Sequence, residues 1–320
     1  MIPLLFLAFQ ADPVFRADID LIRVAVQVTH DNKSKSGLTK KDFLLLDQGS
    51  PQEIIAIETE AQPLDLIILV DVSNSMTPVL RQLKRKSAAA LRQLRDGDRV
   101  GVLSFGTSLK IEHPLTQDFD AVHKAIRQIR GHRPGTELNS NIFEATEYFH
   151  KQARSSARRA ILLFTDNHGD RGVPDSQVID QLWSTDVILH SLIFEGKLPA
   201  NPQPHVEVFS TATAGDIFRV DTQSLNLPSI FDLLRQRYTL IYRAPAALPT
   251  GQVRQIEVQL LNPLPGNTQI RYRAGYRAPS ALPTGQARQI EVQPLNPPPG
   301  NPQIRKRTGY KPKLGNPVSK

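Results

Sequence analysis

The chain has 320 residues, 40% apolar and 22% charged, values typical of a soluble globular protein long enough for one large domain and a smaller one. It contains no cysteine, which excludes disulfides, thiolate metal sites and cysteine nucleophiles. The formal net charge is +8, and residues 276–320 carry +7 of it, from eight Lys or Arg and one Glu. Most of the net positive charge therefore lies in a C-terminal tail. We interpret it as a solvated tail. The alternative is contact with an anionic surface, either nucleic acid or lipid headgroups.

The N-terminal extension, residues 1–17, resembles the end of a secretory signal. A short apolar stretch, MIPLLFLAF, is followed by Ala11, but no positively charged segment precedes it. We expect a truncated signal and therefore an exported protein that is periplasmic, secreted or on the cell surface. The alternative is an ordinary apolar N-terminus on a cytoplasmic protein.

Residues 18–60 have the pattern of β-structure. Apolar side chains alternate with others from Ile22 to Val28, which predicts a half-buried strand. Thr39 and Asp42 have the spacing of a capping box for a single helical turn. Residues 43–58 then read as a strand, a turn at Asp47-Gln48-Gly49, and a second strand.

From residue 63 to 237, buried strands alternate with helices. The strand segments are LDLIILVD, RVGVLSFG, RRAILLFTD, DVILHSLIF and DIFRVD. The predicted helices are 77–95, 118–131, 138–155, 175–185, 206–214 and 228–237. This alternation predicts an α/β fold with a doubly wound parallel sheet, in which ligands bind beyond the carboxyl ends of the strands.

Residues 238–276 return to a β pattern, with Ile256, Val258 and Leu260 on one face of a strand. We expect these strands to pair with those of residues 18–60 in a small β domain. Residues 242–275 recur as 276–309, identical at 27 of 34 positions. The second copy has Pro294 in place of Leu260 and Lys306 in place of Tyr272. Because proline and buried lysine disfavour a core strand, we predict that the first copy folds and that 277–320 form a degenerate copy and a Pro-rich tail.

Hard oxygen donors gather in three segments that adjoin predicted strand ends or a helix start. They are Asp71, Ser73, Ser75, Thr136 and Asp166. Oxygen ligands suit Mg²⁺, Mn²⁺ or Ca²⁺ rather than Zn²⁺ or Cu²⁺. Since only two of the five are carboxylates, a bound cation would remain electrophilic and would accept a carboxylate from outside.

The segments ILVDVSNSM, PGTEL and LLFTDN resemble the metal-ion-dependent adhesion site of von Willebrand factor type A domains. Residues 18–276 as a whole resemble the acidobacterial-type von Willebrand factor A-related family of exported bacterial proteins. The resemblance implies a Rossmann-like doubly wound domain over residues 63–237. It also implies that Ser73, Ser75 and Thr136 coordinate the cation through hydroxyls, that Asp71 and Asp166 act directly or through water, and that one position is left for a partner's Asp or Glu.

The same resemblance implies a partner-binding rim around the cation. We assign to it Asn74, Met76, Glu137, Asn167 and His168. Asn167 replaces the glycine usual in the family, and Glu137 adds an acid beside the site. The central prediction is a non-enzymatic, cation-dependent adhesion or scaffold module that recognises an acidic residue of a protein partner.

Several alternatives stay open. In the first, Ser73 or Ser75 caps the first helix and Thr136 caps the helix 138–155 instead of binding a cation. In the second, the same cation activates water in a hydrolase with Glu137 or His168 as base. In the third, the site is vestigial in a scaffold whose tail binds anions. No Gly-x-Ser-x-Gly motif is present to support a serine hydrolase. No Gly-x-Gly-x-x-Gly or Walker A motif is present either, so a nucleotide cofactor is not expected. The basic residues of segment 77–95 are interpreted as a solvated helix face; they are Arg81, Lys84, Arg85, Lys86, Arg92 and Arg95.

Overall fold

A computed structural model describes residues 21–278 apart from 32, 60, 132–134, 155, 170–171, 195–205, 222, 224, 246–250 and 264. The signal-like segment 1–17 and the second repeat copy from residue 279 onward lie outside the described residues. In the part of the chain that is described, no helix is both long and apolar enough to cross a membrane.

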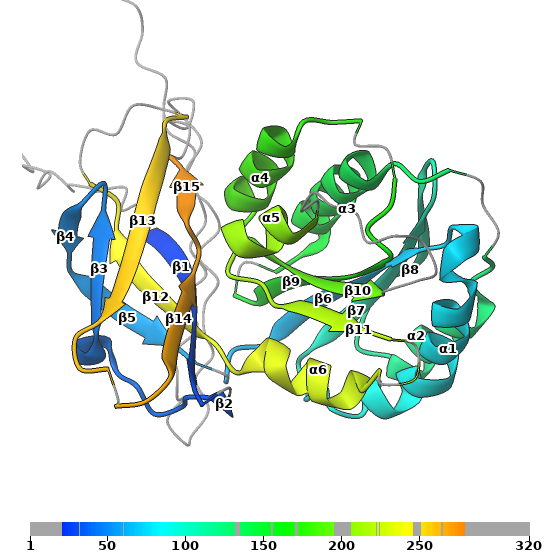
Figure 1. Cartoon of the computed structure of the whole chain (residues 1–320), viewed down its shortest axis with the longest axis horizontal. Helices are drawn as coiled ribbons and strands as arrows, with labels where there is room; N and C mark the ends of the chain where they lie inside the picture. The colour runs from blue at the N-terminus through cyan, green and yellow to red at the C-terminus, as the bar shows by residue number, and fades with distance from the viewer. Residues whose placement is uncertain are drawn as a thin grey trace, which may run out of the picture. The chain divides into compact units, whose positions relative to one another are not determined.

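A six-stranded sheet forms the centre of the region between residues 64 and 220, with the strand order β11-β10-β9-β6-β7-β8 (Figure 1). Neighbouring strands are parallel except β8, which pairs antiparallel with β7. The strands are β6 (Leu64–Asp71), β7 (Arg99–Phe105), β8 (Leu109–Thr116), β9 (Arg158–Thr165), β10 (Val187–Phe194) and β11 (Ile217–Val220).

Helices cover both faces of this sheet, which explains why its strands are continuously apolar. In β6, Leu66, Ile68 and Val70 pack in one core with helices α1, α2 and α6, whereas Ile67 and Leu69 pack in a second core with α3, α4 and α5. The predicted α/β class is thereby confirmed. The helical elements are η2 (Asn74–Met76), α1 (Thr77–Leu91), α2 (Phe119–Gln128), α3 (Leu138–Gln152), α4 (Asp175–Ser184), α5 (Val206–Ala212) and α6 (Leu227–Arg235).

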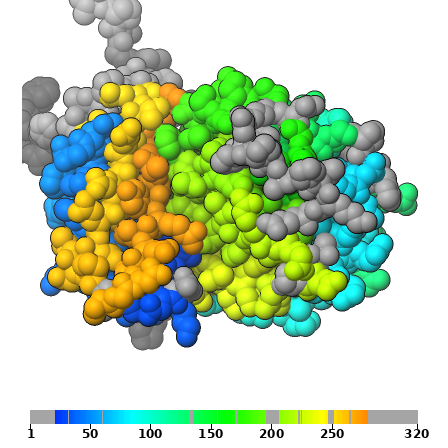
Figure 2. Space-filling model, viewed as in Figure 1, coloured from blue at the N-terminus to red at the C-terminus, as the bar shows by residue number. Residues whose placement is uncertain are grey.

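Two smaller antiparallel sheets share a third core. Their strand orders are β14-β1-β12-β5, with β2 beside β1, and β15-β13-β3-β4. Chain segments from opposite ends of the sequence lie side by side here, as the blue and the yellow to orange atoms of Figure 2 show. The elements are β1 (Leu21–His30), β2 (Lys33–Ser34), η1 (Lys40–Asp42), β3 (Phe43–Asp47), β4 (Ser50–Gln52), β5 (Ile54–Glu58), β12 (Tyr238–Arg243), β13 (Val253–Leu260), β14 (Thr268–Tyr272) and β15 (Gly275–Arg277).

Strand β1 departs from the half-buried strand that its alternation predicts. Its inward face is buried as expected, with Val24 and Val26 fully covered. The opposite face is also buried, because Ala25 packs against Ile188 and Ala214 and Gln27 bonds to Arg271. The prediction of a solvated second face was therefore wrong: that face packs on the strands and loops that follow α4.

Two further elements differ from the sequence prediction. Strand β8 was not predicted; it is an edge strand with one neighbour and many half-exposed side chains, so it lacks an apolar run. After the turn at Gln48 and Gly49, both with positive φ, the chain forms only the short β4 beside β3. It then crosses to the other sheet, where β5 pairs with β12.

Candidate functional site

The candidate site lies at the carboxyl edge of the central sheet. Asp71 is the last residue of β6 and pairs with Phe105 of β7, while Val70 pairs with Phe164 of β9. Strand β9 ends at Thr165, so Asp166 leaves the sheet beside Asp71. Parallel strands present their carboxyl ends at one edge, and this brings the two aspartates together although 94 positions separate Asp71 from Thr165.

The first segment folds back on itself at the end of β6. The Ser73 backbone N–H donates to Asp71 Oδ1 at 2.9 Å, and the Ser73 and Ser75 hydroxyl oxygens lie 3.1 Å apart. The Val72 N–H donates to the Phe105 carbonyl and fixes the start of this loop on β7. Three of the five predicted donors are therefore gathered in one turn.

Thr136, the fourth predicted donor, is held between the ends of β7 and β9. The next residue, Glu137, donates its N–H to the carbonyl of Gly106, the residue that follows β7. On the other side, a Cβ at Gly169 would lie 2.7 Å from the Thr136 carbonyl oxygen, which leaves room for glycine alone. The second segment is thus tied to the strand beside Asp71 and to the loop after Asp166.

The loop after β9 is shaped by local hydrogen bonds. The Asn167 N–H donates to the Thr165 hydroxyl at 3.0 Å, and the His168 N–H donates to Asp166 Oδ1 at 3.2 Å. Asn167 has a φ of 63°, in the left-handed region where glycine is favoured and asparagine is tolerated. This conformation explains why asparagine can stand where the family usually has glycine.

The electrostatics of the site are dominated by buried negative charge. Asp71 is fully buried, and burial raises the pKa of its carboxyl group to about 6 although hydrogen bonds from Ser73 and Thr165 oppose the shift. The neighbouring Asp166 carboxylate raises this pKa further. Among the described residues, no Lys or Arg forms an ion pair with either aspartate. The nearest basic group is the His168 ring, whose Nδ1 lies 3.8 Å from Asp166 Oδ1.

Residues 66–169 match the von Willebrand factor type A domain family, and this span includes all five predicted donors. The chain carries a von Willebrand factor type A (VWA) domain. No curated protein sequence matches the chain.

Several solved structures resemble the chain at low identity. A conserved hypothetical protein, BatB, from Bacteroides thetaiotaomicron is 19% identical over 54% of this chain and 96% of its own, with a TM-score of 0.43. The VWA domain of the type V pili tip protein Mfa5 from Porphyromonas gingivalis is 12% identical over 55% and 94%, with a TM-score of 0.45. A von Willebrand factor type A protein from Catenulispora acidiphila is 11% identical over 82% and 74%, also with a TM-score of 0.45.

The capping alternative can be examined directly in the VWA domain. Ser73 stands at the N-cap of η2, and Met76 and Glu137 stand at the N-caps of α1 and α3. None of these three caps has a side-chain hydrogen bond. The hydroxyls of Ser73, Ser75 and Thr136 are therefore not used to cap these helices and remain available to a ligand.

Of the five predicted rim residues, Met76 is a correction. Its side chain is 1% exposed and packs in the core with α1, so it cannot touch a partner. Asn167 is also buried: its amide donates to Glu207 Oε2 and accepts from the Val206 N–H, which makes it a support for α5. Asn74 is exposed, and Glu137 and His168 are half-exposed.

Sequence reasoning missed two residues that organise the VWA site. Thr165, fully buried, donates from its hydroxyl to Asp71 Oδ2 at 3.2 Å and accepts from the Asn167 N–H. Glu207 orders Asn167 and is itself paired with Arg219 at 2.7 Å. A strand-ending threonine directly before Asp166 was a usable signal for the first. Nothing local in the sequence marked the second, which lies on α5.

A cavity of about 370 Å³ lies elsewhere and is lined by Lys35, Gly37, Thr59, Gln236 and Tyr238, among others. Its walls come from the segment after β2 and from the start of β12. None of its lining residues belongs to the candidate site.

Proposed function

We propose that this chain is a non-enzymatic protein-binding module whose VWA domain holds one divalent cation and uses it to recognise a carboxylate of a partner protein. VWA domains are in general protein-interaction modules, and this coarser role needs no assumption about the cation. The five residues that would hold it are Asp71, Ser73, Ser75, Thr136 and Asp166, with Mg²⁺ the expected ion and Mn²⁺ or Ca²⁺ as alternatives.

The observation that carries the proposal is buried negative charge beside clustered hydroxyls, with no cationic partner for either aspartate among the lysines and arginines that the structure describes. Asp71 and Asp166 are both at most 7% exposed, yet no described Lys or Arg neutralises them. Burying a charge without a partner is costly, and two neighbouring carboxylates repel each other. A bound cation would remove both penalties, which is the arrangement expected of residues selected to hold one.

The donor chemistry fits a hard cation. Carboxylate and hydroxyl oxygens are the ligands that Mg²⁺ and Ca²⁺ prefer, and no nitrogen or sulfur donor is among the five residues. When bound, such an ion supplies positive charge and coordination positions for ligands from outside. Neutral hydroxyls make up the rest of the donor set, so the site retains attraction for a partner's Asp or Glu.

Thermal unfolding of the full chain with Mg²⁺ or with a chelator tests the cation site. An ion at about 100 times its Kd stabilises the native state by about 2.7 kcal/mol. For a protein of this size, that shift corresponds to a Tm increase of roughly 4–6 °C. We expect this response in the wild type and its loss in Thr136→Val, which keeps the side-chain shape.

The matched control is Thr185→Val, which removes a hydroxyl that bonds to Gln181 at the end of α4 instead of one in the site. Its Tm in chelator falls, but its increase with Mg²⁺ should equal that of the wild type. If Mg²⁺ leaves the wild-type Tm unchanged, or raises that of Thr136→Val equally, the proposed cation site is wrong.

A further inference from the structure

The outer surface of helices α1 and α2 forms a basic face close to the candidate site. Arg81 and Arg85 are exposed on α1, and the exposed Arg92 follows as its C-cap, at the i, i+4, i+11 spacing that aligns side chains along a helix. The second helix and the residues after it add three more exposed cations. We define the basic face as Arg81, Arg85, Arg92, Lys124, Arg127 and Arg130.

Contacts between the two helices fix how this face is assembled. Ser87 Oγ lies 2.9 Å from His123 Nδ1, and Lys84 Nζ donates to the Ile129 carbonyl at 2.6 Å. Near the start of α1, a Cβ at Gly131 would lie 3.8 Å from Thr77 Oγ1. The helices therefore run side by side in opposite directions, and the C-terminal end of α2 lies beside the N-terminal end of α1.

This arrangement places part of the basic face next to the candidate site. Thr77 begins α1 only two residues after Ser75, and its hydroxyl donates to the Asn74 carbonyl at 2.9 Å. Arg81 is one helical turn further on, and Arg130 immediately precedes Gly131. A polypeptide that places a carboxylate in the site can thus continue directly onto these arginines.

The cations of the basic face are not used by the fold. Lys84 and Lys86 of α1 bind main-chain carbonyls of neighbouring segments, at Ile129 and Leu225 respectively. By contrast, no member of the basic face forms an ion pair or hydrogen bond with any described residue. Segment 77–95 contains six Lys or Arg and no acid, although residues 1–275 have a net charge of only +1. Residues 118–130 add Lys124, Arg127 and Arg130 against the exposed acids Asp118 and Asp120, so the net positive charge of this surface comes mainly from segment 77–95.

We propose that the partner is an acidic polypeptide segment, with one carboxylate in the cation site and further Asp or Glu side chains along the basic face. The proposal rests on the proposed function for the carboxylate in the site. A membrane is disfavoured because the exposed large apolar side chains among the described residues, Leu21, Ile111, Val253 and Leu261, all lie outside α1 and α2. The same face offers no exposed aromatic ring on which nucleic-acid bases would stack.

Binding of fluorescent poly-L-glutamate to the full chain tests this assignment. To reduce competition, the six cations of residues 301–320 are first changed to Gln in every variant; they are Arg305, Lys306, Arg307, Lys311, Lys313 and Lys320. In this background we compare the triple variant Arg81→Glu, Arg85→Glu, Arg127→Glu with a matched control, Lys33→Glu, Lys40→Glu, Lys41→Glu. The control reverses three exposed lysines of the small β sheets and the adjoining turn.

We expect the triple variant to bind poly-L-glutamate about tenfold more weakly than the control at low salt, because exposed charge pairs contribute up to about 1 kcal/mol each. The loss should occur in EDTA as well as in Mg²⁺ and should shrink as salt rises. The additional affinity gained with Mg²⁺ belongs to the cation site, so its absence would refute the proposed function and leave the basic face supported.

Two results would overturn the basic-face proposal. One is an equal affinity of the triple variant and the control in EDTA. The other is tighter binding of a 20-base-pair DNA or of phosphatidylglycerol vesicles than of poly-L-glutamate at the same salt, since this would assign the face to a different class of partner.

Discussion

At the scale of single residues, the hydroxyl of Thr165 links the two halves of the candidate site. It donates to Asp71 Oδ2 and accepts from the Asn167 N–H, so one side chain orients both a proposed ligand and the loop after Asp166. Groups that position metal ligands typically change affinity by 10–100-fold when removed. Among residues outside the five donors, Thr165 is therefore the one whose replacement should weaken cation binding most.

We predict that Thr165→Val weakens Mg²⁺ binding about tenfold or more. The same change should lower the free energy of unfolding by about 1–3 kcal/mol, since it leaves the buried Asn167 N–H without an acceptor. Thr165→Ser keeps the hydroxyl and should bind Mg²⁺ like the wild type. Titration calorimetry and urea unfolding measure the two effects; equal Mg²⁺ affinities for the Val and Ser variants would refute the positioning role.

A second residue-scale prediction concerns His190, which is fully buried in β10. Burial and the nearby Arg237 lower the pKa of His190 to about 4, while Asp216 opposes the shift. The histidine is therefore neutral in the folded protein, and its Nδ1 accepts from the Asp216 N–H at 3.1 Å. Because the folded pKa lies below the ordinary value near 6.5, unfolding takes up a proton in acid.

The contribution of His190 to stability should consequently be complete above pH 6.5 and fall by about 3 kcal/mol as the pH drops to 4. Asp71, whose pKa is raised to about 6, changes the total stability in the opposite direction over the same range, so the His190 contribution is the difference between the wild type and a His190 variant. His190→Asn, which retains an acceptor in place of Nδ1, should lose this part of the decline. Asp216 does not blur the window, because its own pKa is held below the usual range and its contribution is lost only in stronger acid. Urea unfolding between pH 7 and 4 decides the matter: parallel curves for both proteins would contradict the assignment.

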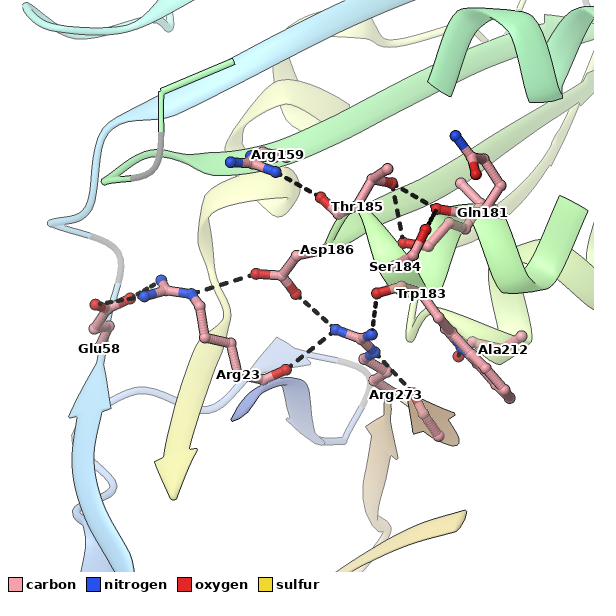
Figure 3. Close-up of polar contacts among 12 residues, drawn as sticks. Arg23, Glu58, Arg159, Gln181, Trp183, Ser184, Thr185, Asp186, Ala212 and Arg273 are labelled. Atoms are coloured by element: carbon pink, nitrogen blue, oxygen red, sulfur yellow. Dashed lines mark hydrogen bonds and ion pairs between the residues drawn. The ribbon is translucent and has the colours of Figure 1, made fainter. Parts of the chain in front are cut away.

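At the scale of elements, Arg273 fastens the strands of the small sheets to α4 and to the start of β10. It bonds to Asp186 Oδ1 at 2.7 Å, to the Trp183 carbonyl, and to the Arg23 carbonyl of β1 (Figure 3). Asp186 also pairs with Arg23, whose guanidinium in turn reaches Glu58 of β5. The small sheets are therefore joined to α4 and β10 here by a network of buried or half-buried charged side chains.

We predict that Arg273→Met lowers the free energy of unfolding by about 1–3 kcal/mol, because it leaves the carbonyls of Arg23, Trp183 and Gly275 without this donor, while the half-exposed Asp186 keeps its pair with Arg23. Arg243→Met, at an exposed arginine without a described partner, serves as the matched control and should cost less than about 0.5 kcal/mol. Urea denaturation gives both values. Comparable losses in the two variants would show that the network contributes little.

The elements also show what the sequence can and cannot predict. The alternation of buried strands and helices predicts the α/β fold, because a strand covered on both faces, β6 above all, must be apolar throughout. Strand β8 could not be found in this way, since an edge strand with Glu112 and Pro114 has no such run. The second buried face of β1 depends on Ile188 and Ala214, more than 160 positions away, and no local pattern encodes it.

The same division holds for the candidate site. Asp71, Ser73 and Ser75 could be predicted because they share one turn, and the structure brings them together. Met76 belongs to the same motif but faces the core, which spacing alone does not reveal. Glu207 comes from α5, and only the tertiary fold brings it to Asn167.

At the scale of the whole molecule, the first repeat copy supplies the end of β12, all of β13 and β14 and the start of β15, and the buried Asp47 of β3 contacts residues of this region. The Asp47 carboxylate accepts from Tyr242 and Tyr276 at 2.9 Å and from Arg254 at 2.8 Å. The positions 34 residues further along the chain hold Tyr276, Arg288 and Tyr310, so this cluster does not distinguish the copies. Leu260 and Tyr272 do, because both pack on the core and become Pro294 and Lys306.

We therefore predict opposite effects for two deletions. Removing residues 280–320 should leave the unfolding temperature within about 2 °C of the full chain, since every described residue of the three cores lies before residue 279. Removing 242–275, so that the second copy follows Ile241, should lower stability by about 3 kcal/mol or more, because a proline and a lysine replace core side chains. Calorimetry distinguishes the two, and equal stability of both variants would show that the copies are interchangeable.

The central claim, that the VWA domain holds one divalent cation between Asp71, the three hydroxyls and Asp166, is tested most directly by counting bound ions. Electron paramagnetic resonance detects free Mn²⁺, so titration of the full chain gives the number bound. We predict one Mn²⁺ per chain, displaced by excess Mg²⁺ and absent from Asp71→Asn and Asp166→Asn, while Arg243→Met binds as the wild type does. Binding that persists in both aspartate variants, or no binding to the wild type, would contradict the account.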